Sequence, residues 1–249
     1  MKLSGKNPVY EKLRVDPKSI VKIYLQTGFS EAGYVHQKAA KHSIPVLTMA
    51  AHQMDRIGRG KNTQGIMADV SDFAYLQYDD LLEQAVKKKR TLVFLDGVTD
   101  PQNLGAILRS LGSLGRFSLV LPTHDSASVT ESVMRVASGG ENYVPIALVG
   151  NINKAIVEAK KENFTIIGTV TSEGTSIYEA DLPLHIGLVI GGEEKGVRPI
   201  ILKNLDMKIT IPMLVSTMSL NVAQATTIFC YEIIRQKKSK KQPIGEETE

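Results

Sequence analysis

The chain has 249 residues, of which 43% are hydrophobic and 22% charged, and its formal net charge is +4. This length and composition support one large domain, or a small domain joined to a medium one. The single cysteine excludes a disulfide framework and a thiolate metal cluster. Because we find neither an apolar run of about 18 residues nor the apolar centre of a signal peptide, we expect a cytoplasmic protein without a membrane span.

The first part of the chain, residues 1–80, is predicted to form a small α/β domain. Short apolar runs rich in branched residues are typical of strands, and a period of three to four residues indicates helices. The expected elements are strands at 19–25 and 44–48 and helices at 9–13 and 30–42. We expect this unit to end near "GIMADVSDFAY".

The second part, residues 91–238, alternates between strands and helices. Several of its strands, such as "IGLVI", are apolar throughout, which is typical of a parallel sheet covered by helices on both faces. The expected strands are 91–95, 118–121, 143–147, 165–170, 186–190 and 208–211, and the expected helices are 103–115, 128–138, 152–162, 199–204 and 219–236. The predicted fold class is therefore α/β.

Two further segments complete the predicted organisation. Residues 81–90, which begin with the helix-like "LLEQAVKKK", are expected to link the domains, and the charged residues 239–249 are expected to be a disordered tail. Basic residues gather in two runs, Lys87 to Arg90 and Arg235 to Lys241. Such runs fit a polyanionic partner. Lysines at the carboxyl ends of helices explain either run equally well, so both interpretations stay open.

The first candidate motif is "DPQNLGAILRS", which follows the strand at 91–95. Parallel sheets bind ligands at the carboxyl ends of their strands. Glycines flank Arg109 on one face of the predicted helix, at Gly105 and Gly112, and each costs about 1 kcal/mol relative to alanine. Glycines kept in a helix despite this cost indicate that another group approaches that face closely. In the alternative, the glycines admit a neighbouring helix, Arg109 is a surface charge, and Asn103 is only a helix cap.

The second motif is "LVIGGEEKGV", where a buried strand ends in paired glycines. Gly191 and Gly192 can expose backbone groups to a flat ligand, and Glu193 or Glu194 can accept a hydrogen bond. A plain turn into a helix, with carboxylates that stabilise the helix start, is the alternative.

The third motif is "ITIPMLVSTMSLNVAQATTI". Here Ser219 is a natural cap for the final helix, and Asn221 is expected in its first turn. Capping does not explain why three strand exits of one sheet are rich in glycine or amides. The histidines lack metal-ligand spacing, and neither a phosphate-binding loop nor a nucleophile turn occurs in the sequence. We therefore expect no metal, dinucleotide or acyl-transfer chemistry.

Taken together, the three motifs resemble those of the SpoU (TrmH) family of RNA ribose 2′-O-methyltransferases, within the SPOUT superfamily. The resemblance runs from about Leu92 to Gln236. In addition, "GKNPVYEKL" and "NTQGI" resemble the small RNA-binding domain of members that modify a guanosine of large-subunit (23S) ribosomal RNA. The resemblance implies a parallel sheet with a carboxyl-terminal deep trefoil knot, preceded by a small L30e-like α/β domain, and a homodimer whose active sites draw on both subunits.

The resemblance also implies the cofactor and the roles of site residues. S-adenosyl-L-methionine is expected among the knot loops, held largely by backbone groups; its expected neighbours are Thr169, Gly191, Ile211 and Leu220. Arg109 is expected to activate the ribose oxygen. A guanidinium is normally only a donor, so in the alternative the proton passes to a neighbouring phosphate while Arg109 steadies the developing alkoxide. Arg109 is expected to be essential, and both roles stay open.

The remaining family positions are expected to hold the substrate. Asn103 and Glu193 position the arginine or the nucleotide, while Ser219 and Asn221 orient ribose and phosphate. Ribosomal RNA is the favoured substrate, because a separate domain of about 80 residues is typical of ribosomal members of the family. Transfer RNA is the nearest alternative, and a noncatalytic RNA-binding or assembly protein is the rival of a different class.

Overall fold

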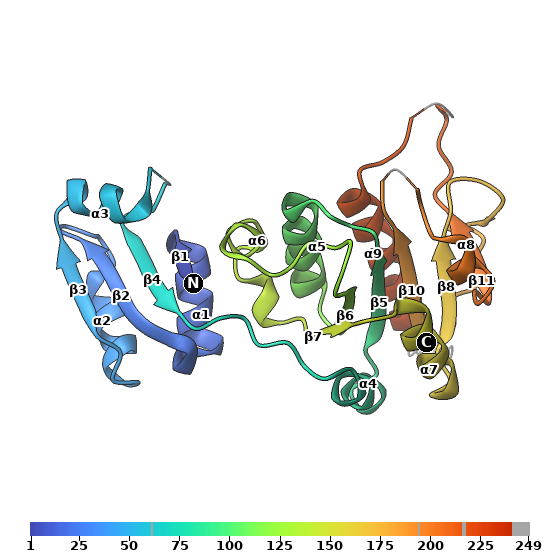
Figure 1. Cartoon of the computed structure of the whole chain (residues 1–249), viewed down its shortest axis with the longest axis horizontal. Coiled ribbons are helices and arrows are strands. Elements are labelled where there is room, and N and C mark those ends of the chain that lie inside the picture. The colour runs from blue at the N-terminus through green and yellow to red at the C-terminus, as the bar shows by residue number, and fades with distance from the viewer. Residues whose placement is uncertain (61, 194, 216–217, 241–249) are drawn as a thin grey trace, which may run out of the picture. The chain divides into compact units, whose positions relative to one another are not determined.

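The computed structural model describes residues 1–60, 62–193, 195–215 and 218–240. They divide into two compact units, whose helices and strands are labelled in Figure 1. Unit 1 comprises residues 1–74, 100–113 and 127–144, and unit 2 comprises residues 75–99, 114–126 and those from 145 onward. Most of the predicted disordered tail, residues 241–249, lies outside the described residues. In the described part of the chain, no helix has the length and apolar character needed to cross a bilayer.

Unit 1 contains a four-stranded mixed sheet in the order β1-β4-β2-β3. β4 pairs antiparallel with β1 and β2, whereas β2 and β3 are parallel. Its strands are β1 (Lys2–Ser4), β2 (Ile20–Gln26), β3 (Val46–Met49) and β4 (Ile66–Val70). Its helices are α1 (Lys6–Val15), η1 (Pro17–Ser19), α2 (Ala32–Ala40), α3 (Ala51–Gly58), α5 (Pro101–Leu114), α6 (Glu131–Ala137) and η2 (Gly140–Asn142), α5 running to the edge of the unit. The predictions for β2, β3, α1 and α2 are confirmed, and β1, β4 and α3 were not predicted.

Unit 2 contains a seven-stranded sheet in the order β7-β6-β5-β10-β8-β11-β9, and every pair in it is parallel. The strands are β5 (Thr91–Asp96), β6 (Phe117–Pro122), β7 (Ile146–Val149), β8 (Thr165–Thr169), β9 (Thr175–Ser176), β10 (Ile186–Gly191) and β11 (Met207–Thr210). The parallel sheet is thus confirmed. β7 begins three residues later than predicted, because Tyr143 ends η2 by donating its backbone N–H to Gly140 O.

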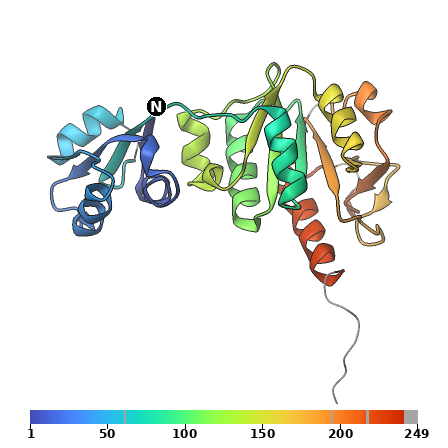
Figure 2. The ribbon, with the colours of Figure 1, turned by 90° about the horizontal axis from the view of Figure 1, so that it is seen from below.

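The helices of unit 2 lie on both faces of this sheet. They are α4 (Tyr78–Lys87), α7 (Ile152–Lys161), α8 (Pro199–Leu202) and α9 (Val222–Ser239). Successive strand residues point to opposite faces. Leu92 and Phe94 of β5 pack in one core cluster with α4 and α7, whereas Thr91 accepts a hydrogen bond from Lys237 Nζ of α9 at 2.7 Å. α4 and α7 therefore cover one face and α9 covers the other (Figure 2).

Residues 81–90, expected as a linker, lie mostly in α4. Leu81, Leu82 and Ala85 are buried in the same core cluster as the sheet. Tyr78 at the start of α4 donates to the carbonyl of Ala155 in α7 at 2.6 Å. α4 is therefore an integral helix of unit 2.

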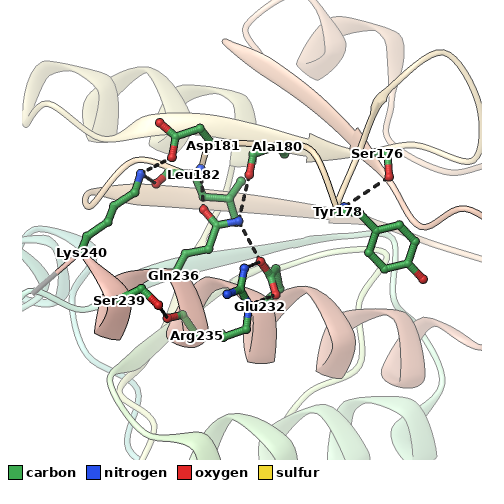
Figure 3. Close-up of polar contacts among 10 residues, drawn as sticks. All are labelled: Ser176, Tyr178, Ala180, Asp181, Leu182, Glu232, Arg235, Gln236, Ser239 and Lys240. Carbon is green, nitrogen blue, oxygen red and sulfur yellow. Dashed lines mark hydrogen bonds and ion pairs between the residues drawn. The ribbon is translucent and has the colours of Figure 1, made fainter. Parts of the chain in front are cut away.

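The carboxyl-terminal end of α9 is attached to the segment after β9 (Figure 3). The carboxamide of Gln236 donates to Ala180 O at 2.8 Å and accepts from Leu182 N at 2.9 Å. One turn later, Lys240 Nζ donates to Leu182 O at 2.6 Å and forms an ion pair with Asp181. These contacts join residues about 55 positions apart and fix the helix end against the sheet edge.

Within unit 1, the two glycines of α5 lie against other backbone and side-chain atoms. A Cβ at Gly105 would lie 2.5 Å from Cβ of Val136 in α6, and a Cβ at Gly112 would lie 2.7 Å from Gly140 O in η2. No real Cβ atom tolerates such distances to fixed neighbours. Close packing against α6 and η2, the neighbouring-helix interpretation of these glycines, is therefore confirmed.

Gly112→Ala is expected to destabilise the protein by about 1 to 3 kcal/mol, because overpacking forces the η2 backbone away from α5. Gly33→Ala in α2 is the matched control, since a Cβ there meets no atom within 4 Å. That control should gain up to about 1 kcal/mol from helix propensity. Urea unfolding of both variants measures whether each substitution lowers or raises the free energy of unfolding. Equal effects in the two variants would contradict the packing between α5 and η2.

Candidate cofactor and catalytic site

Three of the four residues expected around the cofactor lie at one edge of the unit 2 sheet. β8 is hydrogen-bonded to both β10 and β11, with Gly168 opposite Val189 and Ile209 opposite Thr169. Parallel strands end at the same edge, so Thr169 and Gly191 end their strands there, and Ile211 directly follows β11. Thr169 Oγ1 donates to Val189 O at 3.2 Å, which ties two of these strand ends together. Leu220, the fourth residue, directly precedes the cap of α9 and is 36% exposed.

The loop after β10 folds back on its own glycines. A Cβ at Gly191 would lie 2.1 Å from the carbonyl carbon of Gly196, and one at Gly192 would lie 2.3 Å from Gly97 O. Gly192 N donates to Asp96 O at 2.8 Å, and Gly196 N donates to Gly192 O at 2.9 Å. The paired glycines therefore admit backbone from two neighbouring segments, in addition to any ligand.

Asp96, at the end of β5, holds this loop and was missed in the sequence. Its side chain is 1% exposed and forms an ion pair with Arg198 Nε at 2.7 Å. The same carboxylate accepts from the backbone N–H of Arg198 at 2.9 Å. A buried carboxylate needs such partners. The signal that the sequence offers is an acidic residue at the end of an apolar strand, directly before a glycine. In the structure this glycine, Gly97, has a φ of 85°.

Glu193 and Asn221 are brought together in unit 2. Asn221 Nδ2 donates to Glu193 Oε1 at 3.2 Å, and Asn221 Oδ1 accepts from Ala223 N at 2.9 Å. Asn221 is therefore the N-cap of α9, which begins at Val222. The prediction that Ser219 caps this helix is wrong, because the helix begins three residues later. Ser219 is exposed in the segment before the cap.

Asn103 and Arg109 lie on α5 in unit 1. The prediction that Asn103 caps this helix is also wrong: α5 begins at Pro101, and Asp100 Oδ1 accepts from Gln102 N at 2.9 Å. A proline at the first helical position suits such a start. Asn103 is 8% exposed in the first turn, whereas Arg109 is exposed. The expected catalytic residues are thus divided between the two units.

The two basic runs follow the carboxyl ends of helices. Lys87 lies in the last turn of α4 and forms an ion pair with Glu83. Lys237 and Lys238 lie in the last turn of α9, and Arg235 pairs with Glu232 at 2.7 Å. Stabilisation of helix ends accounts for these positions. A contact of these runs with RNA stays a prediction.

Comparisons with known proteins define the class of this architecture. Residues 3–76 match the RNA 2′-O ribose methyltransferase substrate-binding family, and residues 90–231 match the SpoU rRNA Methylase family. A substrate-binding domain followed by a methylase domain is the arrangement of an RNA ribose methyltransferase. The chain belongs to the SpoU rRNA methylase family.

Curated relatives cover most of the chain. It is 32% identical over 243 residues to the 23S rRNA (guanosine-2′-O-)-methyltransferase RlmB of Neisseria meningitidis, which spans 96% of this chain and 97% of that protein. It is also 38% identical over 187 residues to an uncharacterized tRNA/rRNA methyltransferase of Synechocystis, a match that spans 74% of this chain and 49% of that protein.

Solved structures agree with the fold. A TrmH-family RNA methyltransferase from Porphyromonas gingivalis, itself described as putative, has a TM-score of 0.75 at 25% identity, over 94% of this chain and 89% of that chain. The SpoU methyltransferase AviRb from Streptomyces viridochromogenes, in complex with AdoMet, has a TM-score of 0.78 at 24% identity, over 96% of this chain and 91% of that chain.

Proposed function

We propose that this chain transfers the methyl group of S-adenosyl-L-methionine to a ribose 2′-hydroxyl of RNA, and that its substrate is a guanosine of 23S ribosomal RNA. The observation that carries the proposal is the similarity to the Neisseria 23S rRNA methyltransferase over 97% of that protein. The sheet edge at Thr169, Gly191 and Ile211 supports it, because ligands of parallel α/β sheets bind at the carboxyl ends of strands.

The residues at this edge fit the proposed cofactor. Adenosylmethionine carries no phosphate, so backbone groups near Gly191, Ile211 and Leu220 can hold it without a phosphate-binding loop. Gly191 to Glu193 and Lys195 to Val197, the described residues of this loop, lie between Asp96 and Arg198, whose ion pair and backbone hydrogen bond give these backbone groups a defined position. When bound, the cofactor supplies a sulfonium methyl group, and a neutral thioether remains after transfer.

Arg109 steadies the negative charge that develops on the ribose oxygen as it attacks the methyl carbon. The guanidinium stays protonated and acts as a donor, so the hydroxyl proton passes to a neighbouring phosphate of the RNA. Asn103 and Glu193 position the arginine or the nucleotide. Ser219 and Asn221 orient the ribose and its phosphate, and the Asn221–Glu193 contact at 3.2 Å supports a shared role for that pair.

The finer features of the fold and assembly are part of the proposal. We propose that the carboxyl-terminal segment forms a deep trefoil knot; the position of β10 between β5 and β8 supports a complex path of the chain. Residues 1–80 are proposed as an L30e-like RNA-binding domain, with residues 91–238 as the methyltransferase domain. The protein is proposed to act in the cytoplasm, where its ribosomal substrate is, as a homodimer. Exposed apolar residues support a dimer surface that includes α9 and the segment before it; on the helix they are Ile228 and Tyr231, and before it Leu214, Val215 and Met218.

Transfer RNA is the second candidate substrate. The Synechocystis relative is named as a tRNA/rRNA methyltransferase, and the tRNA-modifying TrmH/SpoU enzyme from A. aeolicus matches with a TM-score of 0.53 at 30% identity. That enzyme covers 68% of this chain, however. Since this chain also matches a substrate-binding family at residues 3–76, ribosomal RNA is favoured.

The test is methyl transfer by the purified chain from labelled adenosylmethionine to unmodified 23S rRNA and, separately, to transfer RNA. We expect label in 23S rRNA, recovered after digestion as 2′-O-methylguanosine. Label in transfer RNA alone would favour the second candidate. RNA binding without transfer to either RNA would favour the noncatalytic assembly protein, and would contradict the proposal.

A further inference from the structure

Helix α1 of the four-stranded part of unit 1 contacts the turn η2. Arg14 donates to the phenol oxygen of Tyr143, which in turn donates to Glu11 Oε2. Arg14 Nη2 also reaches Glu11 Oε2 directly, at 2.8 Å. A guanidinium, a phenol and a carboxylate thus form a closed set of charge-assisted hydrogen bonds across this contact.

A buried lysine strengthens the same contact. Lys12 is 7% exposed, and its Nζ donates to Asn142 Oδ1 at 2.9 Å and pairs with Asp16 Oδ2 at 3.2 Å. Glu141, 2% exposed, lies beside it. Burial raises the pKa of Glu141, and the charge of Lys12 opposes that rise. Since a buried charge without partners is costly, Lys12 with its two partners favours one arrangement of α1 and η2 over looser ones.

The turn η2 in turn lies against the backbone of α5 at Arg109. A Cβ at Gly140 would lie 2.6 Å from Leu108 O and 2.8 Å from the Cα of Arg109. From the other side, a Cβ at Gly112 would lie 2.7 Å from Gly140 O. Backbone is packed directly on backbone, so η2 cannot shift without moving the part of α5 that carries Arg109.

The packing of η2 against α1 also leaves no room for a side chain at Gly139. A Cβ at Gly139, whose φ is +93°, would lie 2.5 Å from the Cβ of Glu11. Because Gly139 has no side chain, the η2 turn lies directly against the aliphatic part of Glu11, the residue that accepts the hydrogen bond from Tyr143. The contacts of α1 with η2 and of η2 with the Arg109 segment of α5 are therefore both closely packed.

We propose that Glu11, Lys12, Arg14 and Tyr143 are positioning residues, which join the substrate-binding part of the chain to the helix of Arg109. RNA held by the amino-terminal domain and the guanidinium that acts on it are then parts of one body. The inference rests on the proposed function, because it assigns the arginine as the group that is positioned. Its consequence is that loss of the α1–η2 contact lowers the chemical step and leaves the binding of both substrates nearly unchanged.

The test compares Tyr143→Phe with Tyr10→Phe in the full chain. Tyr10 also lies in α1, and its phenol donates to a carboxylate, Glu31, at 2.9 Å; Glu31 lies next to α2, outside η2. Both variants lose one phenol hydroxyl that bonds a carboxylate. We expect Tyr143→Phe to lower kcat by about tenfold, a modest share of what misplacement in an active site can cost. KM for RNA and cofactor affinity should stay within about twofold of the wild type.

Lys12→Met, which keeps the length of the side chain, should likewise lower kcat and leave KM for RNA nearly unchanged. A purely structural role predicts loss of thermal stability with kcat retained in the folded fraction. If Tyr143→Phe and Tyr10→Phe have the same kcat, the positioning role is wrong.

Hydrogen exchange separates this inference from the proposed function. Tyr143→Phe, and not Tyr10→Phe, should speed the exchange of amides in residues 105–112, because local opening of α5 becomes easier. Absence of methyl transfer by the wild type would refute the proposed function. The exchange rates would still show whether the α1–η2 contact stabilises α5. Unchanged exchange of these amides in Tyr143→Phe would overturn the inference.

Discussion

Arg109→Ala is expected to lower the rate of methyl transfer by about a hundredfold to a thousandfold, the usual effect of removing one preorganised group at a developing oxyanion. Arg109 is exposed on α5, so truncation leaves the apolar face of the helix intact. The interaction is strongest in the transition state, and cofactor binding should therefore change little. Arg109→Lys should fail nearly as badly, since an ammonium lacks the planar fork of donors.

Single-turnover transfer of labelled methyl to RNA measures this effect. The matched control is Arg135→Ala, which removes an exposed arginine from α6 of the same unit. The control is expected to retain the normal rate. If Arg109→Ala methylates as fast as Arg135→Ala, Arg109 is only a surface charge and the proposed mechanism is wrong.

Gly191→Ala is expected to weaken adenosylmethionine binding by about fivefold to 150-fold, which corresponds to the 1 to 3 kcal/mol that overpacking typically costs. The added Cβ would lie 2.1 Å from Gly196 C and 2.3 Å from Val197 N. Those backbone atoms must move, and the loop that borders the proposed cofactor site moves with them. A valine at this position would disturb the loop further.

Gly150→Ala is the matched control, because it lies in the same unit and its Cβ would meet no atom within 4 Å. Calorimetric titration with adenosylmethionine compares the two, and circular dichroism establishes that both are folded. Undiminished cofactor affinity in folded Gly191→Ala would count against a site at this sheet edge.

Much of the fold could be predicted because the sheet of unit 2 is buried on both faces. Strands β5 and β10 are buried at nearly every position, and amphipathic helices such as α5 and α7 lie between successive strands. The elements missed have weaker signals. β1 has three residues and β9 two, too few for any alternation to appear. β4, "IMADV", depends on antiparallel partners that are distant in the sequence.

The candidate site could be predicted as motifs, while their local geometry could not. Two helix starts were misplaced because Ser219 and Asn103 are good caps by residue type, whereas Asn221 and Asp100 make the observed hydrogen bonds. The glycines of α5 indicated a close approach, and the neighbour, η2, became evident only in the structure. Asp96 was missed because its partner, Arg198, is 102 residues away.

The central claim is that the chain methylates a ribose 2′-oxygen of 23S ribosomal RNA. The most direct measurement maps 2′-O-methyl groups in ribosomal and transfer RNA from cells that lack the chain, and from the same cells supplied with the wild type or with Arg109→Ala. The account predicts one guanosine of 23S rRNA whose methyl group disappears in the deletion, returns with the wild type and stays absent with Arg109→Ala. An unchanged methylation map in all of these cells would contradict it.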